Sequence, residues 1–277
     1  MRLCGSALFD RSPQYLLIPH RTILGCDGVV EIDEESRSVT KTYLHPDRNI
    51  AVRNVRREVE YASRFLQALA GVGGVACPRV IAWELSRPPR VVMELCPGRE
   101  LSDFLLRIDG RDPRIADISS RIQTGLEVYT RLFGEPYYDF CFNNMLFDED
   151  SRTVTFLDFV IPEQPVNNSL GSPLEVSLGW LVGCACYTLS RPAFLFSSKA
   201  ASLGVAQTVL AGFDGRVDSG RIYAFARGVF SQMCKSGGRL RKNYYRTVGA
   251  LVTRSCLQRL QRRAASSRPT DTTLLSG

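Results

Sequence analysis

The spacing of hydrophobic and polar positions changes several times along the 277-residue chain. Between residues 14 and 43, apolar and β-branched residues form short runs separated by turn residues, and RSVTKTYL alternates with period two. This predicts a β-meander, because successive side chains of a strand point to opposite faces. From Asn49 to Ala70, apolar residues recur at intervals of three and four, which predicts an amphipathic helix. CPRVIAWEL and PRVVMEL then predict two further strands.

After residue 100 the pattern is mainly helical. Helices are predicted over residues 101–108 and 115–133, and again from residue 172 to about residue 263. Between them, NMLFDE and TVTFLDF flank the polar turn DEDSR and predict a hairpin. Strands with one helix, followed by helices with one hairpin, are typical of an α+β fold with segregated halves. We predict a β-rich segment over residues 1–97, a helical segment over 98–264 and a disordered tail over 265–277.

Composition narrows the class of protein. Apolar residues make up 44% of the chain and charged residues 23%, which is ordinary for a globular protein. No stretch approaches the roughly 18 uninterrupted apolar residues of a membrane span. Asp10 and Arg11 interrupt any signal-peptide core, so we expect a cytoplasmic protein. Nine scattered cysteines without a CxxC pair, and only two histidines, argue against a zinc site of the usual spacing.

The formal net charge of +7 favours anionic partners such as nucleotides, phosphorylated compounds, nucleic acid or acidic membrane surfaces. Much of the excess lies in KSGGRLRKNYYR and RSCLQRLQRR, where a solvated helical face is the simpler interpretation. A basic nucleic-acid-binding protein is a weaker alternative, because Tyr244 and Tyr245 form the only aromatic cluster among basic residues. We expect no stable nucleic-acid partner, and peripheral contact with an acidic membrane stays open.

The stretch YYDFCFNNMLFDEDSRTVTFLDF carries the most informative chemistry. Asn144 follows Asp139 by five residues, and Asp158 comes at the end of the second hairpin strand. Phosphoryl transfer to a hydroxyl needs a carboxylate that orients the hydroxyl and accepts its proton, with an amide oxygen and a second carboxylate that hold Mg²⁺. A loop with Asp139 and Asn144, and Asp158 across a hairpin, brings such groups to one point. Taken alone, an Asp and an Asn in a loop are more often turn formers.

Together with earlier residues, this stretch resembles protein-kinase-like phosphotransferases, especially the aminoglycoside and choline phosphotransferase group; lipopolysaccharide-sugar kinases are also similar. Asp139 and Asn144 match the spacing of the catalytic loop, and the Asp-Phe-Val that begins at Asp158 is similar to the metal-binding segment. Lys41 in VTKTY stands where the phosphate-anchoring lysine is found, and VVMELCPGREL resembles the hinge. The resemblance implies a two-lobed fold that binds ATP and Mg²⁺.

The resemblance also implies roles for single residues. Asp139 is expected to be the catalytic base, and Asn144 and Asp158 the Mg²⁺ ligands. A helix glutamate is expected to pair with Lys41, and two candidates compete. Glu58 is favoured because Ala62 follows it by one turn, whereas Glu60 is followed by Arg64 and belongs to a charged stripe.

The resemblance extends to the nucleotide-binding segments. Backbone groups near Glu94 and Cys96 are expected to bind the adenine, with Met93 beside the nucleotide pocket, although ordinary core is an equally good interpretation for Met93. Gly25 and Gly28 correspond to the phosphate-covering loop, but this is the poorest match, since two glycines in a hairpin are usually just a turn.

Three departures from the family pattern bear on activity. Tyr137-Tyr138 replaces the His-Arg that precedes the catalytic Asp of regulated protein kinases, and no Ala-Pro-Glu follows Asp158. Both favour the small-molecule branch. Ser177-Leu178-Gly179 stands where many relatives have an Asp-Leu-Gly that braces the catalytic loop, so we expect a weakened brace, with Glu175 as an open candidate to replace it.

The predicted function is therefore ATP-dependent transfer of phosphate to a hydroxyl of a small molecule, sugar or glycolipid. The basic balance of the chain disfavours a polycationic aminoglycoside and makes an anionic glycan a reasonable hypothesis. A catalytically inactive binding or regulatory module is the main alternative, and a protein serine/threonine kinase is less favoured.

Overall fold

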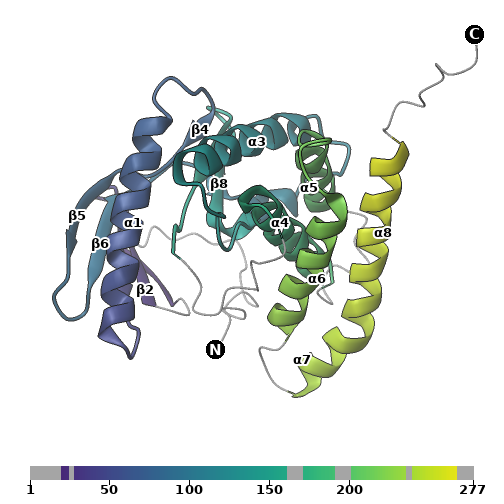
Figure 1. Cartoon of the computed structure of the whole chain (residues 1–277). Coiled ribbons are helices and arrows are strands. Elements are labelled where there is room, and N and C mark those ends of the chain that lie inside the picture. The colour runs from purple at the N-terminus through teal and green to yellow at the C-terminus, as the bar shows by residue number, and fades with distance from the viewer. Residues whose placement is uncertain (1–19, 25–27, 161–170, 191–200, 235–238, 267–277) are drawn as a thin grey trace, which may run out of the picture.

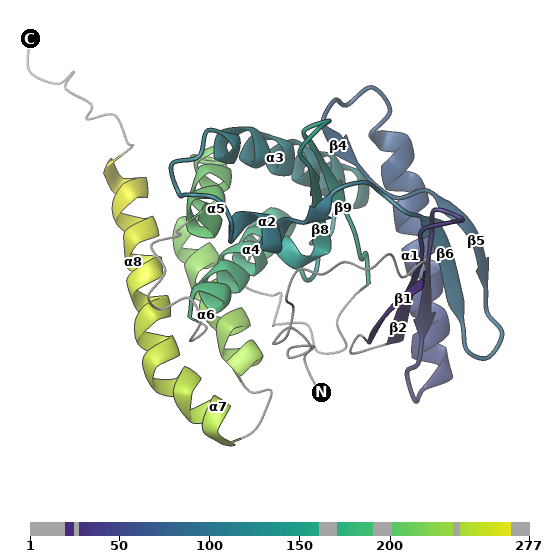
Figure 2. The ribbon, with the colours of Figure 1, turned by 180° about the vertical axis from the view of Figure 1, so that it is seen from behind.

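The computed structural model describes residues 20–24, 28–160, 171–190, 201–234 and 239–266. The chain has an α+β fold, in which most strands precede residue 101 and most helices follow it. In Figure 1 and Figure 2, α1 lies with the larger sheet, and the short strands β8 and β9 lie between that sheet and helices α4 to α8. Within these residues, no helix is both long enough and apolar enough to cross a membrane.

Five antiparallel strands form the larger sheet, in the order β1-β2-β3-β6-β5. They are β1 (His20–Leu24), β2 (Gly28–Asp33), β3 (Ser38–Tyr43), β5 (Val80–Glu84) and β6 (Arg90–Glu94). The predicted strand residues 14–19 lie outside the described part of the chain. The register sets Lys41 on the central strand β3 between Val30 and Val91, so its side chain is carried by a strand that is paired on both sides.

Helix α1 (Arg48–Ala68) packs against this sheet, as its apolar stripe predicts. Asp47 caps it, because its side chain accepts a hydrogen bond from the backbone N–H of Asn49 at 2.8 Å. Ala51 and Val55 join Tyr43, Val91 and Met93 in a small buried cluster between helix and sheet. Burial of this stripe fixes the helix on the sheet.

A smaller sheet has the order β4-β9-β8-β7. The predicted hairpin forms β8 (Met145–Asp148) and β9 (Thr153–Phe156), and β4 (Val75–Ala76) and β7 (Arg99–Glu100) add two residues each. Gly98 precedes β7 at the predicted segment boundary. Its φ is +102°, and a Cβ there would lie 2.6 Å from the carbonyl oxygen of Phe147, so only glycine permits this approach.

The remaining elements are helical: α2 (Leu101–Leu105), α3 (Arg114–Phe133), a 3₁₀ turn η1 (Phe142–Asn144), α4 (Pro173–Leu189), α5 (Ala201–Ala211), α6 (Ser219–Cys234), α7 (Arg239–Tyr244), a π-helical turn η4 (Tyr245–Gly249) and α8 (Ala250–Ser266). Helix α8 continues to Ser266, two residues into the predicted tail. Residues 267–277 lie outside the described part.

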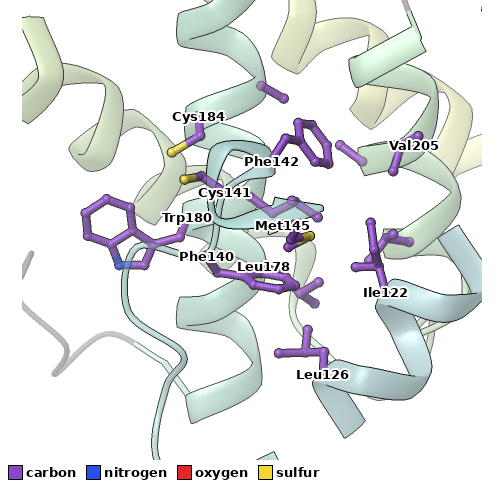
Figure 3. Packing of buried hydrophobic residues seen from close by; sticks show 14 of the residues in the cluster. Ile122, Leu126, Phe140, Cys141, Phe142, Met145, Leu178, Trp180, Cys184 and Val205 are labelled. Carbon is purple, nitrogen blue, oxygen red and sulfur yellow. The ribbon is translucent and has the colours of Figure 1, made fainter. Parts of the chain in front are cut away.

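Helix α4 is the centre of the main hydrophobic core. It is apolar on nearly all sides and contacts α3, α5, α6 and α8. Ser172 and Glu175 form a reciprocal capping box at its start. Figure 3 shows Leu178 of α4 among Phe140, Phe142 and Met145, which belong to the loop and strand of the hairpin region. The loop that carries Asp139 therefore packs against the most buried of the described helices.

Candidate active site

A cavity of about 860 Å³ opens between the larger sheet and the β8–β9 hairpin. Its apolar lining includes Val30 and Val39 from the sheet, and Leu146 and Leu157 from the hairpin region. This apolar part is typical of a small-molecule site, and charged side chains line much of the rest of the cavity. These four residues were not predicted. The available signals were that Val39 shares a strand face with Lys41 and that Leu157 directly precedes Asp158.

Lys41, Glu58 and Asp158 meet in this cavity. Lys41 Nζ lies 2.7 Å from Asp158 Oδ1 and 3.6 Å from Glu58 Oε2. The Glu58 carboxylate is 1% exposed and also accepts hydrogen bonds from the Tyr43 hydroxyl and the Phe159 backbone N–H, both at 3.2 Å. Helix α1, strand β3 and the segment after β9 are thus joined through one buried glutamate.

The charges of this group depend on one another. Burial alone would lower the pKa of Lys41, but the carboxylates of Asp158 and Glu58 outweigh it and hold that pKa well above its ordinary value. Burial raises the pKa of Glu58, and Lys41 limits the rise. The lysine therefore stays cationic and able to hold an anion. By contrast, Glu60 pairs with Arg64 on the exposed side of α1, at 3.1 Å.

Asp139 and Asn144 lie at the two ends of a short loop that contains η1. The Asn144 amide nitrogen donates to the Asp139 backbone oxygen at 2.9 Å and to its Oδ2 at 3.0 Å, which leaves the amide oxygen as the atom suited to a cation. Burial, with a contribution from the Asp158 carboxylate, raises the pKa of Asp139 to about 7. Asp139 and Asp158 have φ of +53° and +62°. This left-handed conformation is uncommon outside glycine and often marks functional sites.

The brace of the Asp139 loop (residues 137–144) is present in a different chemical form. Ser177 Oγ accepts a hydrogen bond from the Tyr137 backbone N–H at 2.9 Å and donates to the Pro173 carbonyl at 2.9 Å. The Glu175 carboxylate instead accepts from the backbone N–H groups of Ser172, which precedes α4, and Asp218, which precedes α6. The brace is therefore made by a neutral serine hydroxyl, and Glu175 does not replace it; its weakening relative to a carboxylate brace stays a prediction.

Further contacts connect the loop to its surroundings. The Tyr137 hydroxyl donates to the Leu157 carbonyl, and its ring stacks on Phe159 with centroids 5.4 Å apart. Arg57 of α1 donates through Nε to the Phe159 carbonyl at 2.8 Å and forms an ion pair with Glu135 just before the loop. The sequence did not indicate a role for Arg57 at this site, because its partners Phe159 and Glu135 are distant in the sequence.

The hinge region differs from the prediction in one respect. Met93 is 8% exposed and belongs to the core, yet it also lines the cavity. The backbone N–H groups of Glu94 and Leu95 donate to carbonyls of neighbouring segments, each at 2.9 Å. They are not free for a ligand, so a hydrogen bond to a purine would have to come from Cys96 or from a carbonyl group.

The glycine positions give little support to a phosphate-covering loop. Gly25 lies outside the described residues. Gly28 begins β2 and is not among the described residues that line the cavity. A Cβ on Gly28 would lie 1.9 Å from the Thr42 carbonyl oxygen. Close packing on β3 therefore accounts for this glycine without any ligand.

The cavity is acidic although the whole chain is basic. Its lining contains eight acidic residues and four basic ones, against a net charge of +7 for the chain. The acidic residues are Glu58, Glu94, Glu100, Asp103, Asp148, Glu149, Asp150 and Asp158; the basic residues are Arg21, Lys41, Arg99 and Arg107. A polyphosphate would thus need accompanying cations here, and the oxygen donors of Asn144 and Asp158 suit the hard ion Mg²⁺.

Comparison with known proteins gives partial similarities to protein kinases. No protein-family model matches the chain. The chain is 32% identical over 166 residues to calcium/calmodulin-dependent serine/threonine-protein kinase 1 of Oryza sativa subsp. japonica, a match that covers 52% of the chain and 27% of that protein. It is 29% identical over 194 residues to CDPK-related kinase 7 of Arabidopsis thaliana, which covers 62% of the chain and 31% of that protein.

The chain thus spans less than a third of the length of the curated relatives it matches. At the coarse level, these weak and partial similarities suggest the protein-kinase-like superfamily. They give no support to the narrower resemblance to aminoglycoside and choline phosphotransferases.

Proposed function

We propose that this chain is a phosphotransferase that moves the γ-phosphate of MgATP to a hydroxyl group. The meeting of Lys41, Glu58 and Asp158 in one cavity carries the proposal. Lys41 and Asp158 are 117 positions apart in the sequence and 2.7 Å apart in space. A partly buried ion pair contributes little net stability once desolvation is counted, so stability alone is a poor reason for this arrangement. Anchoring phosphate and metal is a better one.

Each group has a place in the proposed reaction. The purine occupies the apolar recess beside Met93, and Lys41 exchanges its contact with Asp158 for oxygens of the nucleotide phosphates. Asn144 and Asp158 would hold Mg²⁺, which neutralises charge on the phosphates when it is bound. Asp139 orients the acceptor hydroxyl and takes its proton, and a pKa of about 7 suits that role near neutral pH. Glu58 and Arg57 position these groups without touching the substrate.

The proposal includes a two-lobed arrangement. Residues up to 97, with the larger sheet and α1, would form the nucleotide-binding lobe, and residues 98–264 the lobe that supplies Asp139, Asn144 and Asp158. Gly98 would mark the boundary. The position of the cavity between the sheet and the hairpin supports this division.

For the acceptor we propose a hydroxyl of a small molecule, sugar or glycolipid. The short stretch between Asp158 and α4, which lacks an Ala-Pro-Glu sequence, supports this choice. The acidic lining of the cavity favours a neutral or cationic acceptor over an anionic one. A protein serine or threonine is the second candidate, since both similar proteins are named as kinases and one as a serine/threonine-protein kinase. An inactive kinase-like binding module is the alternative to catalysis.

Thermal unfolding with ATP, with and without Mg²⁺, tests the nucleotide site. A ligand at about 100 times its Kd stabilises the folded state by about 2.7 kcal/mol, which for a chain of this size is about 5–10 °C. Asp158→Ala should abolish the Mg²⁺-dependent rise. Asp150→Ala is the matched control, because it removes an equal charge from the lining of the same cavity.

If millimolar MgATP shifts neither the wild type nor Asp150→Ala, the nucleotide site is refuted. A shift without ADP formation on any hydroxyl acceptor would favour the binding module. Acceptor panels should contain sugars, amino alcohols and serine peptides, with Asp139→Ala as the inactive reference.

A further inference from the structure

Two thiols and a carboxylate converge behind the Asp139 loop. Cys141 immediately precedes η1, and Cys184 lies in the second half of α4. Their Sγ atoms and a carboxylate oxygen of Asp139 all lie within 4.8 Å of one another. Figure 3 shows the two sulfur atoms turned toward each other from the loop and from the helix. The thioether sulfur of Met233 on α6 lies 4.0 Å from Cys184 Sγ and adds a further soft atom.

The geometry is close to that of a metal-ligand set. Ligand atoms lie about 2.0–2.3 Å from a tetrahedral Zn²⁺, so neighbouring ligand atoms are roughly 3.3–3.8 Å apart. Three groups that already lie within 4.8 Å reach this spacing with small rotamer shifts. Two sulfur ligands and one carboxylate select Zn²⁺ over Mg²⁺, because thiolates bind borderline and soft cations and Mg²⁺ requires oxygen.

The surroundings also suit such a site. Both thiols are buried, at 7% and 5% exposure, whereas Asp139 is only partly buried. An ion can therefore approach from the side of the carboxylate and its neighbour Asn144, which lines the cavity. Zinc binding would release the two thiol protons to solvent.

We propose that Cys141, Cys184 and Asp139 form a Zn²⁺ site that, when filled, takes the Asp139 carboxylate away from the acceptor hydroxyl. The ligand set is distinct from the proposed Mg²⁺ ligands Asn144 and Asp158. The inhibitory consequence rests on the proposed function, because it needs Asp139 as the base. The metal site itself does not depend on that function.

Cadmium titration tests the metal site without any activity assay. Cd²⁺ replaces Zn²⁺ at thiolate sites and gives an ultraviolet thiolate-to-metal charge-transfer band. We expect one Cd²⁺ per chain with this band, and displacement of Cd²⁺ by Zn²⁺. Cys184→Ala and Cys141→Ala should each weaken Cd²⁺ binding by more than about tenfold, because loss of an outer-shell partner alone typically costs about 10–100-fold. Cys234→Ala, which removes another buried thiol, should leave the band unchanged.

Circular dichroism and thermal unfolding establish that each variant is folded, and Cys184→Ser serves in place of alanine if the latter is not. A band that survives unchanged in the folded Cys184 variant, or no band in the wild type, overturns the proposal.

If MgATP turnover is observed, Zn²⁺ should inhibit the wild type at concentrations at least tenfold lower than those that inhibit Cys184→Ala, each relative to its own metal-free rate. Binding without inhibition would retain the site and refute its effect on Asp139. Absence of turnover would refute the proposed function and leave the cadmium result intact.

Discussion

Replacing Ser177 with alanine tests whether the hydroxyl on α4 holds the Asp139 loop. Ser177 is fully buried, and its Oγ accepts the hydrogen bond from Tyr137 N at 2.9 Å. Alanine leaves that buried N–H without this partner. An unsatisfied buried donor costs about 1–3 kcal/mol, which corresponds to a fall in Tm of about 2–12 °C for a chain of this size.

The same substitution should affect turnover if the proposed function is right. Ser177 bonds to Tyr137, which lies two residues before Asp139. None of the described side-chain hydrogen bonds of Ser177 reaches Lys41 or the apolar recess. We therefore expect kcat to fall more than KM for ATP rises, because the loop positions the base and contributes less to nucleotide binding.

Ser119→Ala is the matched control. Ser119 is also fully buried on a helix, but its hydroxyl donates only to carbonyl oxygens, the nearer being that of Ile115 at 2.6 Å. Its removal orphans no donor, and the expected loss is under about 1 kcal/mol. Urea unfolding of both variants, followed by circular dichroism, makes the comparison. Equal losses for Ser177→Ala and Ser119→Ala would refute the argument from the buried N–H.

Two further predictions follow from the contacts around the site. Arg57→Ala removes the bond to the Phe159 carbonyl and the Glu135 ion pair, and should cost about 1.5–3 kcal/mol; Arg64→Ala removes an exposed pair and should cost under about 0.5 kcal/mol. Similar losses for both in urea unfolding would contradict this. Asp139 has a pKa raised from 3.8 to about 7, so the folded state binds its proton more tightly than the unfolded chain, and the stability it contributes is lost as pH rises through that interval. In the absence of nucleotide, Asp139→Asn should therefore raise Tm by an amount that grows between pH 4 and pH 7 and stays constant above pH 7. A gain in Tm that does not vary with pH would contradict the raised pKa.

Elements with a long, consistent period agree closely between sequence and structure. Helix α3 begins and ends within one residue of its prediction, because its apolar positions continue over five turns. Strands β4 and β7 were missed, since two residues cannot show a period. Their pairing comes from neighbours: β4 adds to β9 in parallel, and β7 enters beside β8 after Gly98.

The choice between Glu58 and Glu60 as the partner of Lys41 could be made from neighbouring residues of the same helix. It depended on which residues follow one turn later, and helical geometry determines that from the sequence alone. The structure places Glu58 against Lys41 and Glu60 on the exposed face of α1.

Contacts between segments that are distant in the sequence could not be predicted from local patterns. No local pattern shows that a serine hydroxyl on α4 meets the Tyr137 N–H, or that carbonyls of neighbouring segments accept from the N–H groups of Glu94 and Leu95. The acidic lining of the cavity is equally hidden, since net charge describes the whole chain and not the faces that fold together.

The sequence by itself therefore determined the order and type of the main elements and the candidate groups for phosphate and metal. Only the tertiary structure decided which of those groups are close enough to act together, and it brought Cys141 and Cys184 to the same carboxylate although their spacing matches no zinc motif. The physical reason is that periodicity and turn chemistry are local properties of the chain, whereas hydrogen bonds, ligand sets and pKa shifts depend on distances of a few ångströms between segments that meet only in the folded core.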